Sequence, residues 1–345
     1  MRPGTRLAQR LERAWADTDR LSDALSPLAW LYGQLLKGRA LLYRLRWLKP
    51  VTFPVPVIVV GNLLAGGTGK TPTVIGLCAL LRRRGRTPGI VSRGYGGSES
   101  IVAEVTPESL ARDIGDEPLL MRLRCRVPVF IGRDRVAAAR SLLEAYPRVD
   151  VLISDDGLQH VRLARKAQVI VFDERGVANG RLLPAGPLRE PLPETVPPHT
   201  LVLYNHDRPS TPLHGTLAVR GFGGLVSLAD WQCGARPSMA LLDALVDESA
   251  GRPVIAAAGI ARPQRFFDML REAGIVFDPL PLPDHHEFAT PPWPPGTNEV
   301  IVTEKDAVKL DADRTGGARV WVAGLDFGFA PEFESRLFAL LDATS

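Results

Sequence analysis

The sequence predicts an α/β fold, with a mostly parallel sheet flanked by helices, for most of this 345-residue chain. The first observation is that short Val/Ile-rich runs alternate with helical patterns from residue 55 onward, which is typical of βαβ units. The second is a glycine-rich turn between one such run and a helix, in "VIVVGNLLAGGTGKTPTVIGL", residues 57–77. The third is composition, because 45% apolar residues are ample for a buried core.

The predicted elements follow one another in chain order. The first group of strands is expected at 55–60, 87–92, 128–131, 151–154, 168–172 and 201–204, with helices at 71–84, 117–123 and 133–144. The alternation of strand and helix patterns stops after about residue 210, and residues 219–231 have the composition of a short extended linker. A second, smaller α/β unit is expected beyond it, with strands at 254–257, 300–303 and 318–322 and helices at 263–273 and 307–310.

The glycine-rich turn has the features of a phosphate-binding loop. Its glycines let the backbone turn its N–H groups inward, Lys70 can reach the β- and γ-phosphates, and Thr71 can present a hydroxyl to Mg²⁺. Leu64 stands where the strict pattern G-x-x-x-x-G-K-[ST] has its outermost glycine. We expect a P-loop NTPase-type sheet. The residues of its loop that bind the nucleotide are expected to be Gly66, Gly67, Thr68, Gly69, Lys70 and Thr71.

A pair of carboxylates follows the predicted strand 151–154. Asp155 and Asp156 stand at its carboxyl end, which faces the nucleotide crevice in a doubly wound sheet. One of them is therefore placed to support Mg²⁺, although Asp-Gly sequences also favour plain turns. The predicted metal-binding residues are Thr71, Asp155 and Asp156.

Four further polar clusters stand at predicted loops and helix starts. "GDEP" places Asp116 and Glu117 before a proline, which also suits a helix cap. "PDHHEF" places two histidines beside an aspartate, and "SRGYGG" follows a strand. "NGRLLPAGPLREP" is too polar and too long for a simple connection.

The N-terminus differs from the rest of the chain in charge. Residues 1–50 carry a net charge of +6 and the other 295 residues carry −2, which favours a local anionic partner over nucleic acid. Residues 26–50 predict an amphipathic helix with interleaved aromatic and basic side chains. Four cations within it would each cost roughly 2.5–3.5 kcal/mol at mid-bilayer, so we expect it to lie in the membrane interface or to pack on its own domain. No secretory signal is visible, and three scattered cysteines favour a reducing compartment.

The motifs together resemble one family. "VGNLLAGGTGKTP", "SRGYGG", "GDEP", "DDGLQH", "NGRLLPAGPLREP", "AGIARPQRFFDML", "PDHHEF" and "TEKDAVKL" occur here in the order typical of tetraacyldisaccharide 4'-kinase, the lipid A pathway kinase of Gram-negative bacteria. The resemblance covers roughly residues 25–325. It implies transfer of the ATP γ-phosphate to the 4'-hydroxyl of tetraacyldisaccharide 1-phosphate, which would give lipid IVA. It also implies a peripheral enzyme at the cytoplasmic face of the inner membrane, with an N-terminal lipid-binding helix.

Site residues carry over from the resemblance. Lys70 matches the family's loop lysine, Asp116 its proposed catalytic base and His285 the histidine partner of that base, with the adjacent His286 as an alternative. ATP and Mg²⁺ are the implied cofactors, and the lipid A disaccharide precursor and an anionic lipid surface are the implied partners. No nucleic acid and no obligate protein partner is inferred. Further expected substrate-binding residues are Arg93, Glu117, Gln159, His160, Asn179, Arg189 and Glu190.

The charge and composition of successive segments set the expected domain division, and the resemblance supports the membrane role of the first segment. The division is an N-terminal membrane-associating region (1–50), a P-loop kinase domain (51–212), a linker (213–228) and a smaller C-terminal α/β domain (229–345). Because His285 would lie in the last of these, catalysis is expected to involve closure of a cleft.

Two other functions would explain part of the sequence. A P-loop GTPase, ATPase switch or metallochaperone-like protein would account for the loop and the acidic pair, but "TEKDA" does not satisfy the guanine-reading pattern N/T-K-x-D. A soluble small-molecule kinase would leave the aromatic and basic N-terminal helix unexplained.

Overall fold

Two compact units make up the chain in the computed structural model, which describes residues 10–11, 14–15, 19–94, 102–249 and 254–343. The phosphate-loop unit consists of Met1–Thr73, Val149–Ala218 and Phe329–Ser345. The second unit consists of Val74–Arg148 and Val219–Gly328. Each unit is therefore assembled from separate segments, whereas the division predicted from the sequence is continuous.

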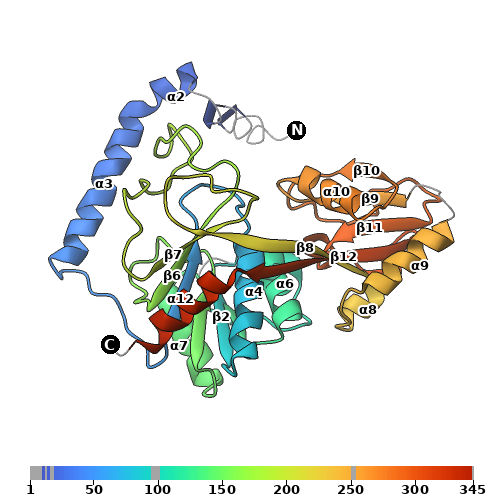
Figure 1. The fold of residues 1–345 in the computed structure, drawn as a ribbon, viewed down its shortest axis with the longest axis horizontal. Helices are drawn as coiled ribbons and strands as arrows, with labels where there is room; N and C mark the ends of the chain where they lie inside the picture. The colour runs from blue at the N-terminus through green and yellow to red at the C-terminus, as the bar shows by residue number, and fades with distance from the viewer. Residues whose placement is uncertain (1–9, 12–13, 16–18, 95–101, 250–253, 344–345) are drawn as a thin grey trace. The chain divides into compact units, whose positions relative to one another are not determined.

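The phosphate-loop unit is built on five parallel strands in the order β5-β1-β6-β7-β8. Their β-branched and leucine-rich runs are buried on both faces, as expected for a parallel sheet covered on both sides. Helix α12 packs against β6 and β7 (Figure 1). The bounds of the strands are Val57–Gly61 (β1), Val151–Ser154 (β5), Ala167–Phe172 (β6), Thr200–Tyr204 (β7) and Thr216–Ser227 (β8).

The second unit has two groups of strands. In one, β2 pairs parallel with β4 and β3 pairs antiparallel with β4. In the other, β10, β9, β11 and β12 form a parallel set in that order. The bounds are Pro88–Ser92 (β2), Ala103–Glu104 (β3), Val129–Ile131 (β4), Val254–Ala258 (β9), Phe277–Pro281 (β10), Glu299–Thr303 (β11) and Arg319–Phe329 (β12).

Helices connect the strands, as the alternating pattern predicts. The long N-terminal helix, blue in Figure 1, is α3 and begins with Pro27 in its first turn, a position that proline favours. The helical bounds are Arg20–Ala24 (α2), Ser26–Arg44 (α3), Lys70–Arg83 (α4), Ala111–Ile114 (α5), Asp116–Cys125 (α6), Arg135–Ala145 (α7), Leu228–Gln232 (α8), Met239–Ser249 (α9), Pro263–Glu272 (α10), Glu304–Ala307 (α11) and Pro331–Asp342 (α12).

Separate apolar cores stabilise the two units. In the phosphate-loop unit, Leu64, Phe172 and Tyr204 belong to one buried cluster, in which the two aromatic rings stack. In the second unit, Leu120 of α6 packs in the same core as Val302 of β11 and Ala307 of α11. This second core brings the start of α6 close to the segments that follow β10 and β11.

Most predicted elements are present, and the differences have physical reasons. The predicted linker forms β8, because residues 216–227 are extended and pair with β7 at their start. The predicted helix 307–310 is wrong in position: the helical turn is α11, Glu304–Ala307, because Thr303 caps it. The sequence also predicts a polar helix over residues 5–24; half of that range lies outside the described residues, and α2 forms its end. None of the helices in the described part of the chain is both long and apolar enough to cross a membrane.

Candidate active site

Polar residues follow four neighbouring parallel strands of the phosphate-loop unit. Asn62 and the glycine-rich loop follow β1, Asp155 follows β5, Asp173 follows β6 and Asn205 follows β7. Because parallel strands end at the same edge of a sheet, these groups meet around the loop, where α/β proteins bind their ligands.

The loop adopts the backbone that its glycines allow. Gly66 and Gly69 have φ values of +94° and +93°, in the region that favours glycine. A Cβ atom on Gly69 would lie 1.9 Å from the side-chain nitrogen of Asn205, which donates a hydrogen bond to the Thr68 carbonyl at 3.1 Å. Gly69 is therefore required both by its backbone and by its close neighbour.

Leu64 explains why the outermost glycine is dispensable. Its side chain is fully buried in the core of the unit. Its backbone lies in an antiparallel bridge with Leu188, and the adjacent Arg189 donates its N–H to the Leu63 carbonyl at 2.7 Å. The entry to the loop is thus a paired, packed segment, and it fixes Arg189 beside the loop.

Lys70 contacts an amide and a carboxylate. Its Nζ lies 3.4 Å from Asn62 Oδ1 and 3.7 Å from Asp156 Oδ1. Asp156 in turn accepts a hydrogen bond from Arg189 at 3.0 Å. One member of the predicted acidic pair and one predicted substrate-binding residue therefore meet at the loop lysine.

Asp155 and Asp156 differ in exposure. The Asp155 side chain is almost fully buried, like Thr71, whereas Asp156 is partly exposed and takes a positive φ of 46°. Gly157 follows them, and a Cβ there would lie 2.4 Å from Ser154 Oγ. The turn after β5 therefore requires glycine, and it leaves the Asp156 carboxylate more exposed than that of Asp155.

Arg175 is a loop contact that the sequence reasoning missed. It forms a bidentate pair with Asp173, which is fully buried, and donates hydrogen bonds to the carbonyls of Ala65 and Gly67. Arg175, which follows β6, therefore holds the first half of the loop in place. The signal was available, because an acidic residue directly after a buried parallel strand belongs to the same sheet edge.

Three predicted substrate-binding residues lie in short connections. Gln159 donates to the Asn62 carbonyl at 3.3 Å, and the His160 carbonyl accepts from Arg165 at 2.7 Å. Arg93 is exposed just after β2 in the second unit. The rest of its motif, residues 95–97, lies outside the described residues.

The remaining predicted residues connect the long loop to the N-terminal helices. Asn179 donates to Ser22 Oγ at 3.1 Å and to the Ala185 carbonyl at 3.0 Å. Glu190 pairs with Arg39 of α3 at 3.2 Å, and the Arg189 carbonyl accepts from Tyr32 at 2.8 Å. The Asn179 amide thus anchors α2, while Arg189 and Glu190 hold α3.

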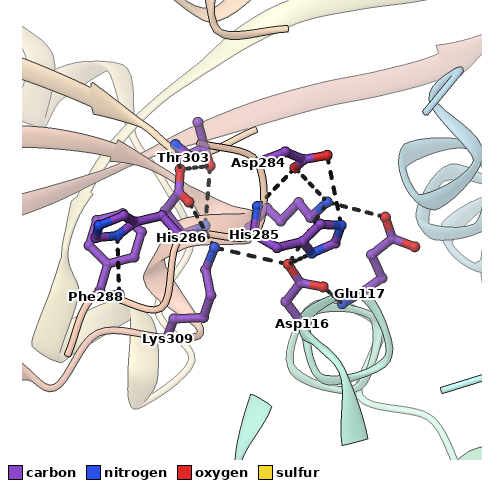
Figure 2. Close-up of polar contacts among 11 residues, drawn as sticks. Asp116, Glu117, Asp284, His285, His286, Phe288, Thr303 and Lys309 are labelled. Carbon is purple, nitrogen blue, oxygen red and sulfur yellow. Dashed lines mark hydrogen bonds and ion pairs between the residues drawn. The ribbon is translucent and has the colours of Figure 1, made fainter. Parts of the chain in front are cut away.

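A carboxylate–imidazole pair lies in the second unit. Asp116 is the first residue of α6, and its Oδ2 lies 2.9 Å from Nδ1 of His285, on the turn after β10 (Figure 2). His286 points away, and its Nδ1 accepts the Phe288 N–H at 3.1 Å. Of the two adjacent histidines, His285 is the partner of Asp116.

Two lysines face the same carboxylate. Lys305 and Lys309 place their Nζ atoms 3.8 and 3.9 Å from Asp116 Oδ2, and Lys305 also lies 3.3 Å from Glu117 and 3.5 Å from Asp284. Lys309 is almost fully buried. The sequence reasoning assigned no role to either lysine.

These neighbours shift the pKa values of the pair. Burial raises the pKa of the Asp116 carboxyl, but the hydrogen bond with His285 and the charges of Lys305 and Lys309 outweigh it, so the pKa lies below its ordinary value. The hydrogen bond to Asp116 holds the pKa of His285 above its ordinary value. The pair therefore favours the ionised carboxylate, which is the form a proton acceptor needs.

The fold and the loop define a P-loop nucleotide-binding protein. Residues 21–342 match the family model described as Tetraacyldisaccharide-1-P 4'-kinase (LpxK). The chain belongs to this family.

Individual relatives agree with the family match. The chain is 53% identical to the tetraacyldisaccharide 4'-kinase of Leptothrix cholodnii over 98% of its own length and 97% of that protein. It is 52% identical to that of Methylibium petroleiphilum, over 96% and 92%. A crystal structure of LpxK from Aquifex aeolicus in complex with ATP superposes with a TM-score of 0.75 at 27% identity, covering 93% of this chain and 99% of the other.

Proposed function

We propose that this protein is an ATP-dependent kinase that phosphorylates the 4'-hydroxyl of tetraacyldisaccharide 1-phosphate to form lipid IVA. The observation that carries the proposal is the similarity to curated 4'-kinases, because it extends over the segments that hold both the phosphate loop and the Asp116–His285 pair. The ATP complex of the Aquifex relative supports ATP as the nucleotide that this protein binds.

The phosphate loop would bind the nucleotide. The N–H groups of its glycine-rich backbone and the start of α4 would favour phosphate oxygens, and Lys70 would exchange its contact with Asp156 for the β- and γ-phosphates. Arg175 and Asn205 would keep the loop in shape, because both hold its carbonyl groups from outside. Such positioning is the main requirement of phosphoryl transfer.

The residues around the loop fit Mg²⁺. No group of three His, Cys, Asp or Glu side chains in the described residues could hold a metal alone, and Mg²⁺ commonly uses one or two carboxylates together with phosphate oxygens. Thr71, Asp155 and Asp156 are the residues that would hold it. Bound Mg²⁺ would neutralise charge on the phosphates.

Asp116 would act as the general base. Its ionised carboxylate would accept the proton of the sugar hydroxyl as the new bond to phosphorus forms, and His285 would orient it through the 2.9 Å hydrogen bond. The cleft closure and the continuous domain division inferred from the sequence stay predictions.

Helix α3 would bring the protein to the lipid. Its large apolar side chains are mostly exposed, among them Trp30 at 67% and Leu35 at 65%. The basic residue Arg44 is the last residue of the helix. A helix with exposed aromatic, leucine and basic side chains suits the interface of an anionic membrane. We therefore infer a peripheral location at the cytoplasmic face of the inner membrane.

The test is transfer of labelled γ-phosphate from ATP to tetraacyldisaccharide 1-phosphate in mixed micelles. We expect a phosphorylated lipid from the wild type and its loss in Lys70→Ala and Asp116→Ala. Lys166→Ala and Asp268→Ala, which change exposed polar groups, are the matched controls and should retain activity. ATP hydrolysis by the wild type without a lipid product would refute the proposal and favour an ATP-driven switch.

A further inference from the structure

The segment 303–309, "TEKDAVK", has no role in the proposed chemistry, yet its charged side chains converge on the Asp116–His285 pair. Its helical turn α11 is capped by Thr303, which accepts the Asp306 N–H at 3.2 Å. The turn also packs against α6, the helix that Asp116 begins. The segment is therefore positioned to set the geometry of the pair.

Asp306 is a fully buried carboxylate with several donors around it. Its Oδ2 accepts from Thr303 Oγ1 at 2.7 Å and from the Gly259 N–H at 3.0 Å, while Oδ1 accepts from Lys309 Nζ at 3.0 Å. A buried charge with this many donors is retained at a cost in desolvation, so it marks a position where a specific geometry is needed. Simple capping of a four-residue turn would not require it.

The Asp306 contacts extend to both members of the pair. Gly259, held by Asp306, accepts the His285 N–H through its carbonyl at 3.2 Å. A Cβ on Gly259 would lie 2.9 Å from Asp306 Oδ1, so the approach is tight. Lys309, held by the other oxygen of Asp306, lies 3.9 Å from Asp116 Oδ2 (Figure 2).

Lys309 has little freedom to move elsewhere. It is 8% exposed, and its Nζ lies 5.2 Å from the centre of the Phe288 ring. Its charge is therefore directed to the two carboxylates rather than to solvent, and a desolvated charge acts strongly on its neighbours.

We propose that Asp306 and Lys309 form a buried positioning pair that sets the location and the charge state of the Asp116–His285 pair. This inference rests on the proposed function, in which Asp116 is the base. Neither residue is placed at the sugar hydroxyl or the phosphates in the proposal: Asp306 fixes the His285 turn through Gly259, and Lys309 keeps Asp116 ionised. In the described part of the chain, the other charged groups that pair with Asp116 are His285 on that turn and Lys305 on α11, and Lys305 also pairs with Asp284 and Glu117.

The test exploits the opposite charges of the two residues. Lys309→Met removes a positive charge beside Asp116, so the acid limb of the kcat/KM profile should move to higher pH, with kcat about tenfold lower. Asp306→Asn removes a negative charge, so the same limb should move to lower pH. Lys309→Arg keeps the positive charge, so the acid limb should stay at its wild-type position. A purely structural role predicts reduced activity without opposite shifts.

Arg271→Met is the matched control. Arg271 forms the same (i, i+3) bridge, with Asp268 at 2.7 Å, and lies 5.4 Å from the Phe277 ring, but both partners are half exposed. This variant should have the wild-type profile.

A second readout is independent of lipid activity. The chain has six histidines, so the His285 ring can be assigned by comparison with His285→Asn and titrated by NMR. Its pKa should rise in Lys309→Met and fall in Asp306→Asn relative to the wild type.

Unchanged titration and unchanged pH profiles in folded variants would overturn the inference, as would shifts in the same direction. If Lys309→Met does not fold, Asp306→Asn and Lys309→Arg decide by the same readouts. Absence of lipid phosphorylation in the wild type would instead refute the proposed function and leave the NMR test decisive.

Discussion

Asp116 Oδ2 and His285 Nδ1 lie 2.9 Å apart, and the contact joins residues that are 169 positions apart in the chain. The core of the second unit makes it possible, because Leu120, one turn after Asp116, packs with residues of β11 and α11. Asp116 itself is 7% exposed, whereas His285 is 48% exposed. The pair is thus a buried carboxylate held by a more accessible ring.

The first prediction concerns the roles of these two residues. Asp116→Asn should lower kcat by about 10²–10⁴-fold, the range for removal of a general base, with little change in the affinity for ATP. His285→Asn should cause a smaller loss, because the carboxylate remains. His286→Asn is the control, since an amide oxygen can still accept the Phe288 N–H. Steady-state kinetics in mixed micelles measures all three, and an equal loss in the two histidine variants would contradict the assignment.

The second prediction concerns stability and pH. The Asp116 pKa lies below 3.8, so its contribution is present above that value and is lost as the pH falls through the lower folded pKa. The His285 pKa lies above 6.5, so its contribution is full below that value and is lost as the pH rises through the higher folded pKa. The ion pair therefore stabilises the fold most at about pH 4 to 6.5.

Urea unfolding at several pH values measures this window. The difference in unfolding free energy between the wild type and His285→Asn should be larger at about pH 5.5 than at about pH 9. The same difference for His286→Asn should show less dependence on pH. A difference for His285→Asn that grows toward alkaline pH would be inconsistent with the charges described.

The third prediction concerns Leu64, which departs from the strict phosphate-loop pattern. Leu64→Gly restores the pattern but removes a fully buried side chain, so it should destabilise the protein by at least about 2–5 kcal/mol. Leu64→Met keeps the volume and should cost less than about 1.5 kcal/mol. Chemical unfolding measures both, and isothermal titration with ATP should show no gain in affinity for Leu64→Gly. A more stable or tighter-binding glycine variant would mean that the packed entry is not what shapes the loop.

The sequence was sufficient for the parts of the fold and site that depend on local patterns. The strand 151–154 and the helix after Lys70 follow from apolar runs and glycine spacing, and they appear within a residue or so of the expected bounds. The resemblance indicated His285, and the structure distinguishes it from His286 by contact.

Other parts could not be predicted because they depend on packing between distant segments. Arg175 and Asn205 reach the loop only because β6 and β7 end at the same edge as β1, and their strand neighbours fix that order. Lys309 meets Asp116 only through the core that joins α6 to α11. A substrate role for Asn179 stays a prediction, while its hydrogen bond to Ser22 shows that it holds α2. A polar residue in a long loop has many chemically equivalent uses, and only its contacts distinguish them.

The last prediction concerns membrane binding by α3. Leu31 and Leu35 are 51% and 65% exposed and, being four residues apart, lie on the same face of the helix. Replacing both by serine should weaken binding to vesicles that contain anionic phospholipid by at least about tenfold, because less apolar surface is buried in the interface. Vesicle sedimentation gives the affinity, and ATP binding checks that the phosphate loop is intact.

Val276→Ser is the matched control for this experiment. Val276 is 66% exposed, just before β10 in the second unit, and belongs to no proposed lipid-binding helix. Its variant should bind vesicles like the wild type. If the double leucine variant also binds like the wild type, α3 is not the membrane contact. Its exposed leucines would then need another partner, because so many large apolar side chains on one helix are costly to leave in water.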